Sequence, residues 1–291
     1  MISILMPIKN EALYIESALK SIFEIDECNF EVIVVDDGST DNSILLLKNL
    51  NYPFVRIIET DGIGKAAAFS LAYERALGDY FILLAGDDLL VASALKDRVI
   101  PLRSATPETP TITFCKLKSF SETKAYDGMI LPKNPNKGLE SGGCMAFNKA
   151  FGDLVFPIPS MLANEDSWLV LHARYLPVTV IHVPIIGLMY RIHANNSYKR
   201  GVEFAQVNEQ MWLRQRALFY FYETYKEKLL PSQQRELLVE FCLQLLRYLG
   251  YPLVLLFLPR APIKNKIKFF FNATPYLYLL RERFYKFFSG R

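Results

Sequence analysis

The fold is decided by two segments, EVIVVDDGSTD at residues 31–41 and YFILLAGDD at residues 80–88. Each is a continuous apolar run of strand length that contains or ends in two adjacent carboxylates. Strands of a parallel sheet are buried on both faces and therefore read as unbroken runs of Val, Ile and Leu. In open α/β sheets, ligands bind just beyond the carboxyl ends of such strands. The two acidic pairs therefore predict one cleft, in which one pair grips a polar ligand and the other holds a divalent cation.

The first hundred residues alternate between apolar runs of strand length and segments with a helical apolar period. Strands are expected at residues 2–6, 30–35, 55–58 and 80–84. Helices are expected after Asn10-Glu11, after a capping Ser39 or Thr40, at residues 65–77 and at residues 92–100. This alternation is typical of βαβ units, so the sequence predicts an α/β fold with a mainly parallel sheet flanked by helices.

The pattern loosens after Pro101 and becomes wholly helical towards the C-terminus. Further strands are expected at residues 111–120, 141–147 and 178–191, with a short helix at residues 165–174. Helices are expected at residues 203–229 and 232–248, and a proline-broken tail follows them. We therefore expect two regions, residues 1–200 and a helical extension at residues 201–291.

The charge of the chain is unevenly distributed. Its formal net charge is +3, but residues 260–291 carry eight Lys and Arg against one Glu, a local net charge of +7 interleaved with aromatic side chains. Basic amphipathic helices with an aromatic face lie in the membrane interface, where anionic lipids attract them. We therefore expect peripheral attachment to a membrane surface. The alternative is that the aromatic residues pack against the first region, and nothing in residues 1–200 indicates nucleic-acid binding.

The cysteines and the most apolar segments of the sequence indicate the cellular compartment of the protein. The cysteines lie far apart and form no CxxC pair, which favours a reducing compartment; they are Cys28, Cys115, Cys144 and Cys242. The N-terminal segment lacks the basic residues followed by a long apolar run that mark a signal peptide. Residues 237–258 are the nearest to a membrane span, but Glu240, Gln244, Arg247 and Pro252 interrupt them. We expect a cytoplasmic protein on the inner face of the membrane.

Each acidic pair has an ordinary interpretation beside the functional one. Asp36-Asp37-Gly38-Ser39 has the composition of a turn or helix cap, yet its carboxylates can also accept hydrogen bonds from a nucleotide base or ribose. Asp87 and Asp88 would repel one another without a compensating cation or donors. Mg²⁺ and Mn²⁺ favour such carboxylates together with substrate phosphate oxygens. The second pair therefore indicates a divalent-metal site, although acids are also common at helix N-termini.

A set of motifs follows in a characteristic order along residues 1–200. They are Pro7 with Asn10-Glu11, VVDDGSTD at residues 34–41, the helix of residues 64–76, Gly78-Asp79-Tyr80, Gly86-Asp87-Asp88, SGGCMAF at residues 141–147, Asn164-Glu165-Asp166 and YRIHANNS at residues 190–197. As an ordered set they resemble the nucleotide-sugar domain of family 2 glycosyltransferases, whose fold is called GT-A. The resemblance implies a Rossmann-like GT-A catalytic domain over residues 1–200.

The resemblance implies roles for several residues. Around the base and ribose of the donor nucleotide it places Pro7, Glu11, Asp36 and Asp37. It assigns the metal that bridges the donor diphosphate to Asp88, with Asp87 contacting ribose or ordering the metal shell. The metal motif of the family is often Asp-any-Asp, whereas this chain has two adjacent acids. The division of roles between Asp87 and Asp88 is therefore less defined than the presence of the metal.

The remaining candidate residues lie further along the chain. The resemblance implies that Asp166 is the general base and that His193 lies near the metal or the diphosphate, although a lone His is more often an ordinary core or surface residue. Arg191 and Lys199 could neutralise phosphate, and so could Lys65, which follows a glycine turn that is not a P-loop. The acids Glu165 and Asp166 could instead simply satisfy a helix N-terminus.

The implied reaction is inverting transfer of a sugar from a nucleotide-diphosphate donor, UDP- or dTDP-linked, to a hydroxyl of a glycan or lipid-linked acceptor. A cation, Mn²⁺ or Mg²⁺, stabilises the charge on the departing diphosphate, and one carboxylate base takes the proton of the attacking hydroxyl. Such transfers are typical of cell-envelope polysaccharide and glycolipid assembly.

Two other functions remain open. A sugar-phosphate nucleotidyltransferase would carry a Gly-rich basic loop directly after the first strand, where this chain has Pro7-Ile8-Lys9-Asn10. A non-catalytic scaffold that binds a nucleotide sugar is the second alternative, and the presence of every expected acid argues against it.

Overall fold

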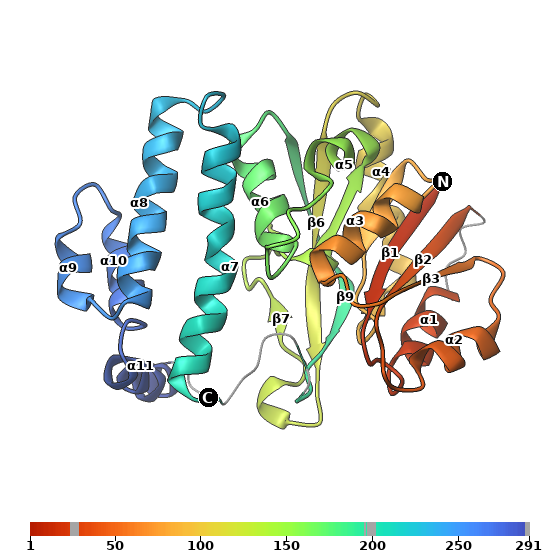
Figure 1. Cartoon of the computed structure of the whole chain (residues 1–291), viewed down its shortest axis with the longest axis horizontal. Helices are drawn as coiled ribbons and strands as arrows, with labels where there is room; N and C mark the ends of the chain where they lie inside the picture. Colours follow the sequence, from red (N-terminus) through yellow and green to blue (C-terminus); the bar gives the residue numbers. More distant parts are fainter. Residues whose placement is uncertain (24–28, 195, 197–201, 289–291) are drawn as a thin grey trace. The chain divides into compact units, whose positions relative to one another are not determined.

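The computed structural model describes residues 1–23, 29–194, 196 and 202–288, with only the backbone described for Ala125 and residues 282–288. Cys28 and Lys199 lie outside the described residues. The chain divides into two compact units, Met1–His193 and Ala194–Arg291, which are described separately (Figure 1). The sequence places a boundary near residue 200.

The first unit is built on one sheet whose strand order is β3-β2-β1-β4-β8-β6-β9-β5, with β7 paired to β6. Four strands form its parallel half; they are β1 (Ile2–Ile8), β2 (Phe30–Asp37), β3 (Val55–Thr60) and β4 (Tyr80–Leu83). β1 pairs in parallel with both β2 and β4, and β2 pairs in parallel with β3. Every residue of β1 is buried, which is why this strand reads as a continuous apolar run.

The other half of the sheet is mixed. Its strands are β5 (Leu89–Leu90), β6 (Thr111–Phe120), β7 (Ile130–Leu131), β8 (Met145–Asn148) and β9 (Thr179–Arg191). β8 runs antiparallel to both β4 and β6, whereas β6 and β9 are parallel. β5 and β7 pair antiparallel with β9 and β6. The predicted α/β fold with a mostly parallel sheet is therefore confirmed, with an antiparallel strand inserted at its centre.

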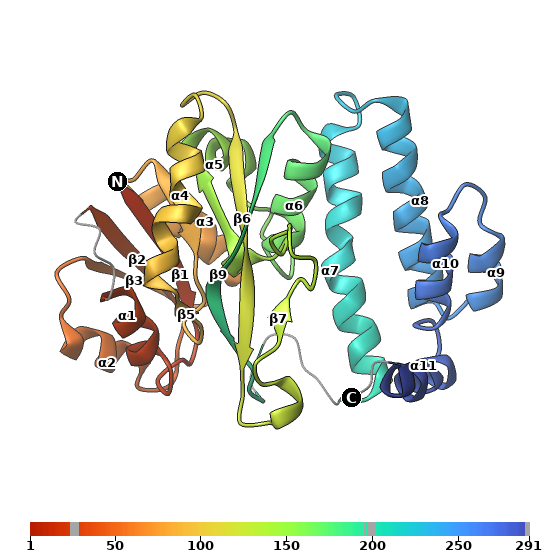
Figure 2. The ribbon, with the colours of Figure 1, turned by 180° about the vertical axis from the view of Figure 1, so that it is seen from behind.

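Helices cover both faces of this sheet. They are α1 (Ile15–Phe23), α2 (Ser43–Leu50), α3 (Lys65–Arg75), α4 (Leu95–Ser104), α5 (Lys149–Val155) and α6 (Asp166–Tyr175). Figures 1 and 2 show α3 and α5 on one face and α1 and α4 on the other. Alternate β1 residues such as Ile4 and Met6 join Leu19 of α1 and Val99 of α4 in one apolar core. The sheet thus fixes the carboxyl ends of its strands between two packed helical layers.

Several boundaries differ from the sequence predictions. The predicted cap at Ser39 or Thr40 is wrong, because α2 begins only at Ser43 after an Asn42 N-cap. Ser39 and Thr40 are instead bonded to Asn10: Ser39 Oγ accepts from its backbone N–H and Thr40 N–H donates to its Oδ1. Short 3₁₀ turns at Ala92–Ala94 and Gly142–Cys144 delay the starts of α4 and β8, and a third such turn spans Lys124–Tyr126.

The second unit is helical, as predicted. Its helices are α7 (Phe204–Tyr225), α8 (Pro231–Tyr248), α9 (Pro252–Phe257), α10 (Ile263–Phe270) and α11 (Pro275–Phe288). Trp212 of α7 stacks on Tyr248 of α8 with ring centroids 4.9 Å apart. A small core of Leu243, Leu255, Ala261 and Phe269 joins α8, α9 and α10. Within the described part of the chain, no helix is both long and apolar enough to cross a membrane.

Candidate active site

Acidic side chains gather where β1, β2 and β4 end. Ile8, at the end of β1, pairs in register with Asp36 of β2, and Asp87 and Asp88 follow β4, which pairs with β1 on the other side. Because the carboxyl ends of parallel strands lie at one edge of the sheet, these acids share that edge. Pro7 is buried in β1 beside Val35. The edge therefore brings together Pro7, both acidic pairs and Glu11, as predicted from the strand ends.

Asp37 holds the glycine turn that begins α3. Its Oδ1 accepts a hydrogen bond from Gly64 N–H at 2.7 Å, and its Oδ2 lies 3.7 Å from Lys9 Nζ. Gly62 and Gly64 have φ values of +91° and +88°, a conformation that L side chains rarely adopt. These glycines allow the turn to run directly over the end of β2.

Asp36 is a buried carboxylate with an unfilled acceptor. Its Oδ2 accepts from Ser39 N–H at 3.0 Å, while Oδ1 is buried and has no partner in the structure. A buried acceptor without a partner is costly, by about 1–3 kcal/mol. A ligand N–H or O–H presented at this edge would satisfy it, which fits a residue that contacts a nucleotide base or ribose.

Asp87 and Asp88 are joined to the end of β9. Asp88 Oδ1 accepts from the backbone N–H of Arg191 at 2.9 Å, although the two residues are 103 positions apart. The Arg191 side chain donates through Nε to the backbone oxygen of Asp87 at 2.8 Å. His193 Nε2 lies 3.0 Å from Asp87 Oδ2. The structure therefore brings all four predicted residues together, with His193 beside Asp87.

Arg191 is held between two aromatic rings. Its guanidinium carbon lies 4.7 Å from the Tyr14 ring centroid and 4.5 Å from that of Phe120, and Nη2 donates to Ser17 Oγ at 3.0 Å. Tyr14 also contacts the His193 ring at 4.6 Å. These contacts make Arg191 a residue that positions the acids. Tyr14, Ser17 and Phe120 were not predicted, because each is an ordinary core or helix residue in the sequence.

Burial and like charge raise the pKa of two carboxyls at this edge. Burial, and then the charge of Asp87, raises the pKa of Asp88 well above its usual value. Burial also raises the pKa of Glu11 to about 8, with Asp87 again the next cause. Glu11 lies over Gly86, where a Cβ would come within 3.0 Å of its Cγ. The nearby Lys65 and Arg191 lower these two pKa values by less than burial and Asp87 raise them.

The donor set at this edge fits a divalent cation. Asp87, Asp88 and His193 offer carboxylate oxygens and one imidazole nitrogen, ligands that suit Mn²⁺ and, through the oxygens, Mg²⁺. Among the residues that the structure describes, no three His, Cys, Asp or Glu side chains are already arranged as a complete metal site. A cation here would therefore take further ligands from a bound diphosphate, as Mg²⁺ commonly does.

Asp166 begins α6 beside a partly buried ion pair. Its Oδ1 accepts from Ser167 N–H at 2.8 Å and from the Asn164 side-chain amide. The preceding Glu165 is buried and paired through Oε1 with Lys65 Nζ at 3.1 Å, while its Oε2 is buried without a partner in the structure. Lys65 therefore ties the start of α3 to the start of α6, a contact that the predicted role in phosphate binding did not include.

Gly142 makes room for this pair. A Cβ at residue 142 would lie 2.7 Å from Glu165 Oε1, so any side chain would displace the carboxylate that Lys65 holds. The segment SGGCMAF was recognised only as part of the resemblance, and its role was not predicted. A glycine in a strand pattern signals a close approach, but the sequence does not show what approaches.

Residues 3–155 of the chain match the protein family described as Glycosyl transferase family 2. An uncharacterized glycosyltransferase of Haemophilus influenzae is 33% identical over 102 residues, which are 34% of this chain and 41% of that protein. TarS of Staphylococcus aureus, a poly(ribitol-phosphate) β-N-acetylglucosaminyltransferase, is 30% identical over 100 residues, 33% of this chain and 18% of TarS. The chain thus spans about two fifths or less of the length of these curated relatives.

Two solved structures share the fold. TarS of S. aureus in complex with UDP-GlcNAc matches with a TM-score of 0.64 and 17% identity, covering 94% of this chain and 81% of that one. The mannosyltransferase PcManGT of Pyrobaculum calidifontis, in complex with GDP-Man and Mn²⁺, matches with a TM-score of 0.58 and 19% identity, covering 92% and 73%. More than half of the chain matches the family, and its strand order positions acids at the expected edge. The chain therefore belongs to glycosyl transferase family 2, and its fold is the GT-A fold predicted from the sequence.

Proposed function

We propose that the protein transfers a sugar from a nucleotide-diphosphate donor, UDP- or dTDP-linked, to a hydroxyl of a glycan or lipid-linked acceptor, with inversion. One arrangement carries this proposal. Asp87 and Asp88 are bonded to His193 and Arg191. At the same edge of the sheet, the buried Oδ1 of Asp36 has no hydrogen-bond partner in the structure. Family membership supports the class of reaction. The structure of TarS is a complex with UDP-GlcNAc, and that of PcManGT is a complex with GDP-Man and Mn²⁺.

The donor nucleoside is proposed to lie over the ends of β1 and β2. Asp36 Oδ1 would accept a hydrogen bond from the base or ribose, and Asp37, Pro7 and Glu11 would surround it. Glu11 is half-buried beside Gly86 and is therefore placed between the nucleoside and the second acidic pair. Lys65 and Arg191 are the nearest positive side chains to these acids and would offset the diphosphate charge.

The cation is proposed to bind at Asp88 and His193, with Asp87 as a further ligand or as the partner that orients His193. It would neutralise the negative charge that develops on the departing diphosphate. Asp88 is fixed for this task by the backbone N–H of Arg191, and Arg191 is itself clamped between Tyr14 and Phe120. The protein thus holds the metal-binding carboxylates in place before any ligand arrives.

Asp166 is proposed to take the proton of the attacking hydroxyl. Bonds from Ser167 N–H and Asn164 fix Oδ1 at the start of α6, and the Lys65–Glu165 pair fixes the segment that precedes it. A single displacement assisted by this one base would give inversion at the anomeric carbon.

The test is to incubate the protein with a panel of UDP- and dTDP-sugars and Mn²⁺ and to measure release of the nucleoside diphosphate. Release from one or more donors is expected, with a rise in unfolding temperature for the same donors. A nucleotidyltransferase would instead release pyrophosphate from a sugar phosphate and a nucleoside triphosphate. A scaffold would bind the donor without releasing nucleoside diphosphate.

We also propose that the second unit attaches the protein to the inner face of a membrane through an apolar patch on α9 and α10. The patch consists of Leu253, Val254, Phe257, Ile263 and Ile267, and Phe257 and Ile263 are 84% and 75% exposed. The exposed bases Arg260, Lys264 and Lys268 lie among these residues in the sequence. Exposed apolar side chains beside positive charge suit an interface with anionic lipids.

A further inference from the structure

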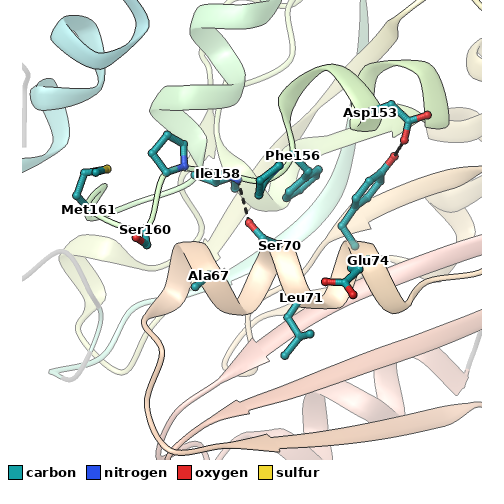
Figure 3. A pocket seen from close by; sticks show the side chains of 12 residues that line it. Ala67, Ser70, Leu71, Glu74, Asp153, Phe156, Ile158, Ser160 and Met161 are labelled. Atoms are coloured by element: carbon teal, nitrogen blue, oxygen red, sulfur yellow. Dashed lines mark hydrogen bonds between the residues drawn. The ribbon is translucent and has the colours of Figure 1, made fainter. Parts of the chain in front are cut away.

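A groove lies along α3, apart from the acidic edge of the sheet. Its volume is about 770 Å³, within the range of about 300–1,000 Å³ typical of ligand pockets. One wall is α3 and the other is the segment from Phe156 to Met161, which connects α5 to α6 (Figure 3). All of its lining residues belong to the first unit.

The α3 wall comes from one face of the helix. Ala67, Ser70, Leu71 and Glu74 follow the helical spacing and line the groove, whereas Phe69 and other residues on the opposite face are buried against the sheet. Ser70 Oγ accepts from Ile158 N–H at 2.9 Å, which fixes the second wall against α3 (Figure 3). The two walls are therefore held at a set separation.

One end of the groove lies towards the segments that lead to the proposed base. Ala67 lies in the first turn of α3, two residues after Lys65, whose Nζ is paired with Glu165 at 3.1 Å. The second wall runs from Ser160 and Met161 into the Asn164-Glu165-Asp166 segment. Figure 3 shows Ala67, Ser160 and Met161 at one end and Glu74 and Asp153 at the other. From Ala67 to Glu74 the helix rises about 10 Å, so the groove extends along α3 by about that length.

The lining combines apolar surfaces with acidic and hydroxyl groups. Pro157, Pro159 and Met161 present apolar surface, and Met161 is 53% exposed. The charged side chains that line the groove are the acids Glu74 and Asp153. Asp153 Oδ1 accepts from the Tyr73 hydroxyl at 2.6 Å and pairs with Lys149 at 3.1 Å. Ser160 adds a hydroxyl group, whereas the Ser70 hydroxyl already donates to the Ala66 backbone oxygen and accepts from Ile158 N–H.

This chemistry fits an uncharged saccharide. The C–H faces of sugar rings pack on apolar side chains, while their hydroxyls donate to carboxylates and exchange hydrogen bonds with Ser hydroxyls. Each acid has a basic neighbour, because Arg75 Nε lies 3.8 Å from Glu74 Oε1 and Lys149 Nζ lies 3.1 Å from Asp153 Oδ1. The groove therefore presents no excess of positive charge that would attract a polyanionic chain. A purely lipid ligand would make no hydrogen bonds with these carboxylates.

We propose that this groove binds the saccharide chain of the acceptor, a neutral glycan, beyond the hydroxyl that is glycosylated. The inference rests on the proposed glycosyl transfer and names the class of acceptor that the site takes. The sugar nearest the reaction lies at Ala67 and Met161, and the following part of the chain extends towards Glu74 and Asp153.

The test uses saturation-transfer NMR with three neutral tetrasaccharides, maltotetraose, cellotetraose and chitotetraose, and with the anionic tetragalacturonate. Signal transfer to at least one neutral tetrasaccharide is expected, and none to tetragalacturonate. Ala67→Trp fills the groove, so its affinity for that tetrasaccharide should fall by about tenfold or more. Leu45→Trp places the same side chain on the exposed face of α2 and should bind as the wild type does.

A second variant tests the acidic end without filling the groove. Glu74→Gln removes one carboxylate at an exposed helix position, and it should weaken neutral tetrasaccharide binding while relieving the exclusion of tetragalacturonate. Glu108→Gln, in an exposed turn outside the groove, is the matched control. Unfolding temperatures and their rise with the nucleotide sugar establish that each variant is folded.

The outcomes separate this inference from the proposed function. Equal tetrasaccharide binding by wild type and Ala67→Trp, preference for tetragalacturonate, or binding of none of the four saccharides overturns the groove assignment, even when nucleoside diphosphate is released from a donor. Failure to bind or hydrolyse any donor overturns the proposed function, whatever the saccharide results.

Discussion

The two units depart from the usual distribution of side chains in opposite directions. The first buries carboxylates at the edge of its sheet, where Asp36, Asp88 and Glu165 are each 4% exposed. The second exposes large apolar residues on α9 and α10, of which Phe257 is the most exposed. Folding alone favours neither arrangement, because buried charge and exposed apolar surface both cost free energy. The contrast fits the two different partners proposed above, a cation with its nucleotide for the first unit and a lipid surface for the second.

The largest effect is expected from a substitution of Asp166, the proposed base of the first unit. Asp166→Asn keeps the shape of the side chain but removes its basicity, so transfer should fall by about 10²–10⁴-fold. Donor binding, measured by calorimetry or by the shift in unfolding temperature, should persist. Transfer at the wild-type rate would refute the role of Asp166 as base. Asp97→Asn, an exposed acid in the first turn of α4, is the control and should leave transfer unchanged.

The buried acids of the first unit should be needed for a cation. Asp88→Asn removes the carboxylate held by Arg191 N–H, and donor hydrolysis should fall by about 10²–10³-fold, the effect of losing one electrostatic stabiliser. The measurement is nucleoside diphosphate release at increasing Mn²⁺, together with Mn²⁺ binding followed by electron paramagnetic resonance. Unchanged hydrolysis and Mn²⁺ binding would show that the acidic edge holds no metal at Asp88.

Not every buried polar group of the first unit belongs to a site. His172 of α6 is fully buried, its Nδ1 lies 2.8 Å from the Trp168 backbone oxygen, and burial lowers its pKa to about 4 from 6.5. Because the folded pKa lies below the unfolded one, its stability contribution is intact above pH 6.5 and is lost as the pH falls towards 4.

The expected loss from His172 at pH 4 is about 3 kcal/mol in the free energy of unfolding. His172→Gln should lower stability at neutral pH but flatten its decline between pH 6.5 and 4, as measured by urea unfolding at several pH values. An equally steep decline in the variant would assign the acid sensitivity to other groups. Donor binding near neutral pH should not follow this titration.

The apolar patch of the second unit should be needed for vesicle binding. Phe257→Asp combined with Ile263→Asp should lower affinity for anionic phosphatidylglycerol vesicles by about tenfold or more, since burying each side chain contributes about 1.5–3 kcal/mol. Flotation of the protein with vesicles measures this. Leu77→Asp changes a comparably exposed apolar residue of the first unit and should have no effect. An equal loss of vesicle affinity in both variants would show that the apolar patch is not the membrane-binding surface.

The smallest expected effect comes from the bases of the second unit. Lys264→Gln and Lys268→Gln should each weaken binding to anionic vesicles by about 1 kcal/mol or less, and the difference should vanish at high salt. Lys266 is the control for these two lysines, because it has a structural role: its Nζ donates to the Leu256 backbone oxygen at 2.9 Å. If vesicle binding depends neither on salt nor on these lysines, positive charge does not contribute to it, and only apolar contacts remain.

Local patterns in the sequence predicted much of the first unit. The apolar runs that end in Asp36-Asp37 and Asp87-Asp88 located the strands and the acidic edge, because strand burial and strand ends are visible in a short segment. The antiparallel insertion of β8 between β4 and β6 was not predicted, since pairing between distant strands leaves no local signal. The cap at Ser39 or Thr40 failed because Asn10, from another segment, bonds to both residues.

Contacts within the site that join distant segments could not be predicted. Lys65 and Glu165 are 100 positions apart, and neither belongs to a pattern that indicates the other. The clamp on Arg191 by Tyr14 and Phe120 is equally invisible, because both rings read as ordinary residues of a helix or strand. The groove along α3 depends on the path of residues 156–161, which carry no helix or strand period.

The bond from Arg191 to Asp88 has a consequence for the order in which the protein is made. The strands that carry Asp36 and Asp88 leave the ribosome early, but the residue that fixes Asp88 follows 103 positions later. At about 5–20 residues per second, the nascent chain waits roughly 5–20 s for that partner. A translation product that stops at residue 155, where the family match ends, would carry the acids without the strand that holds them in place.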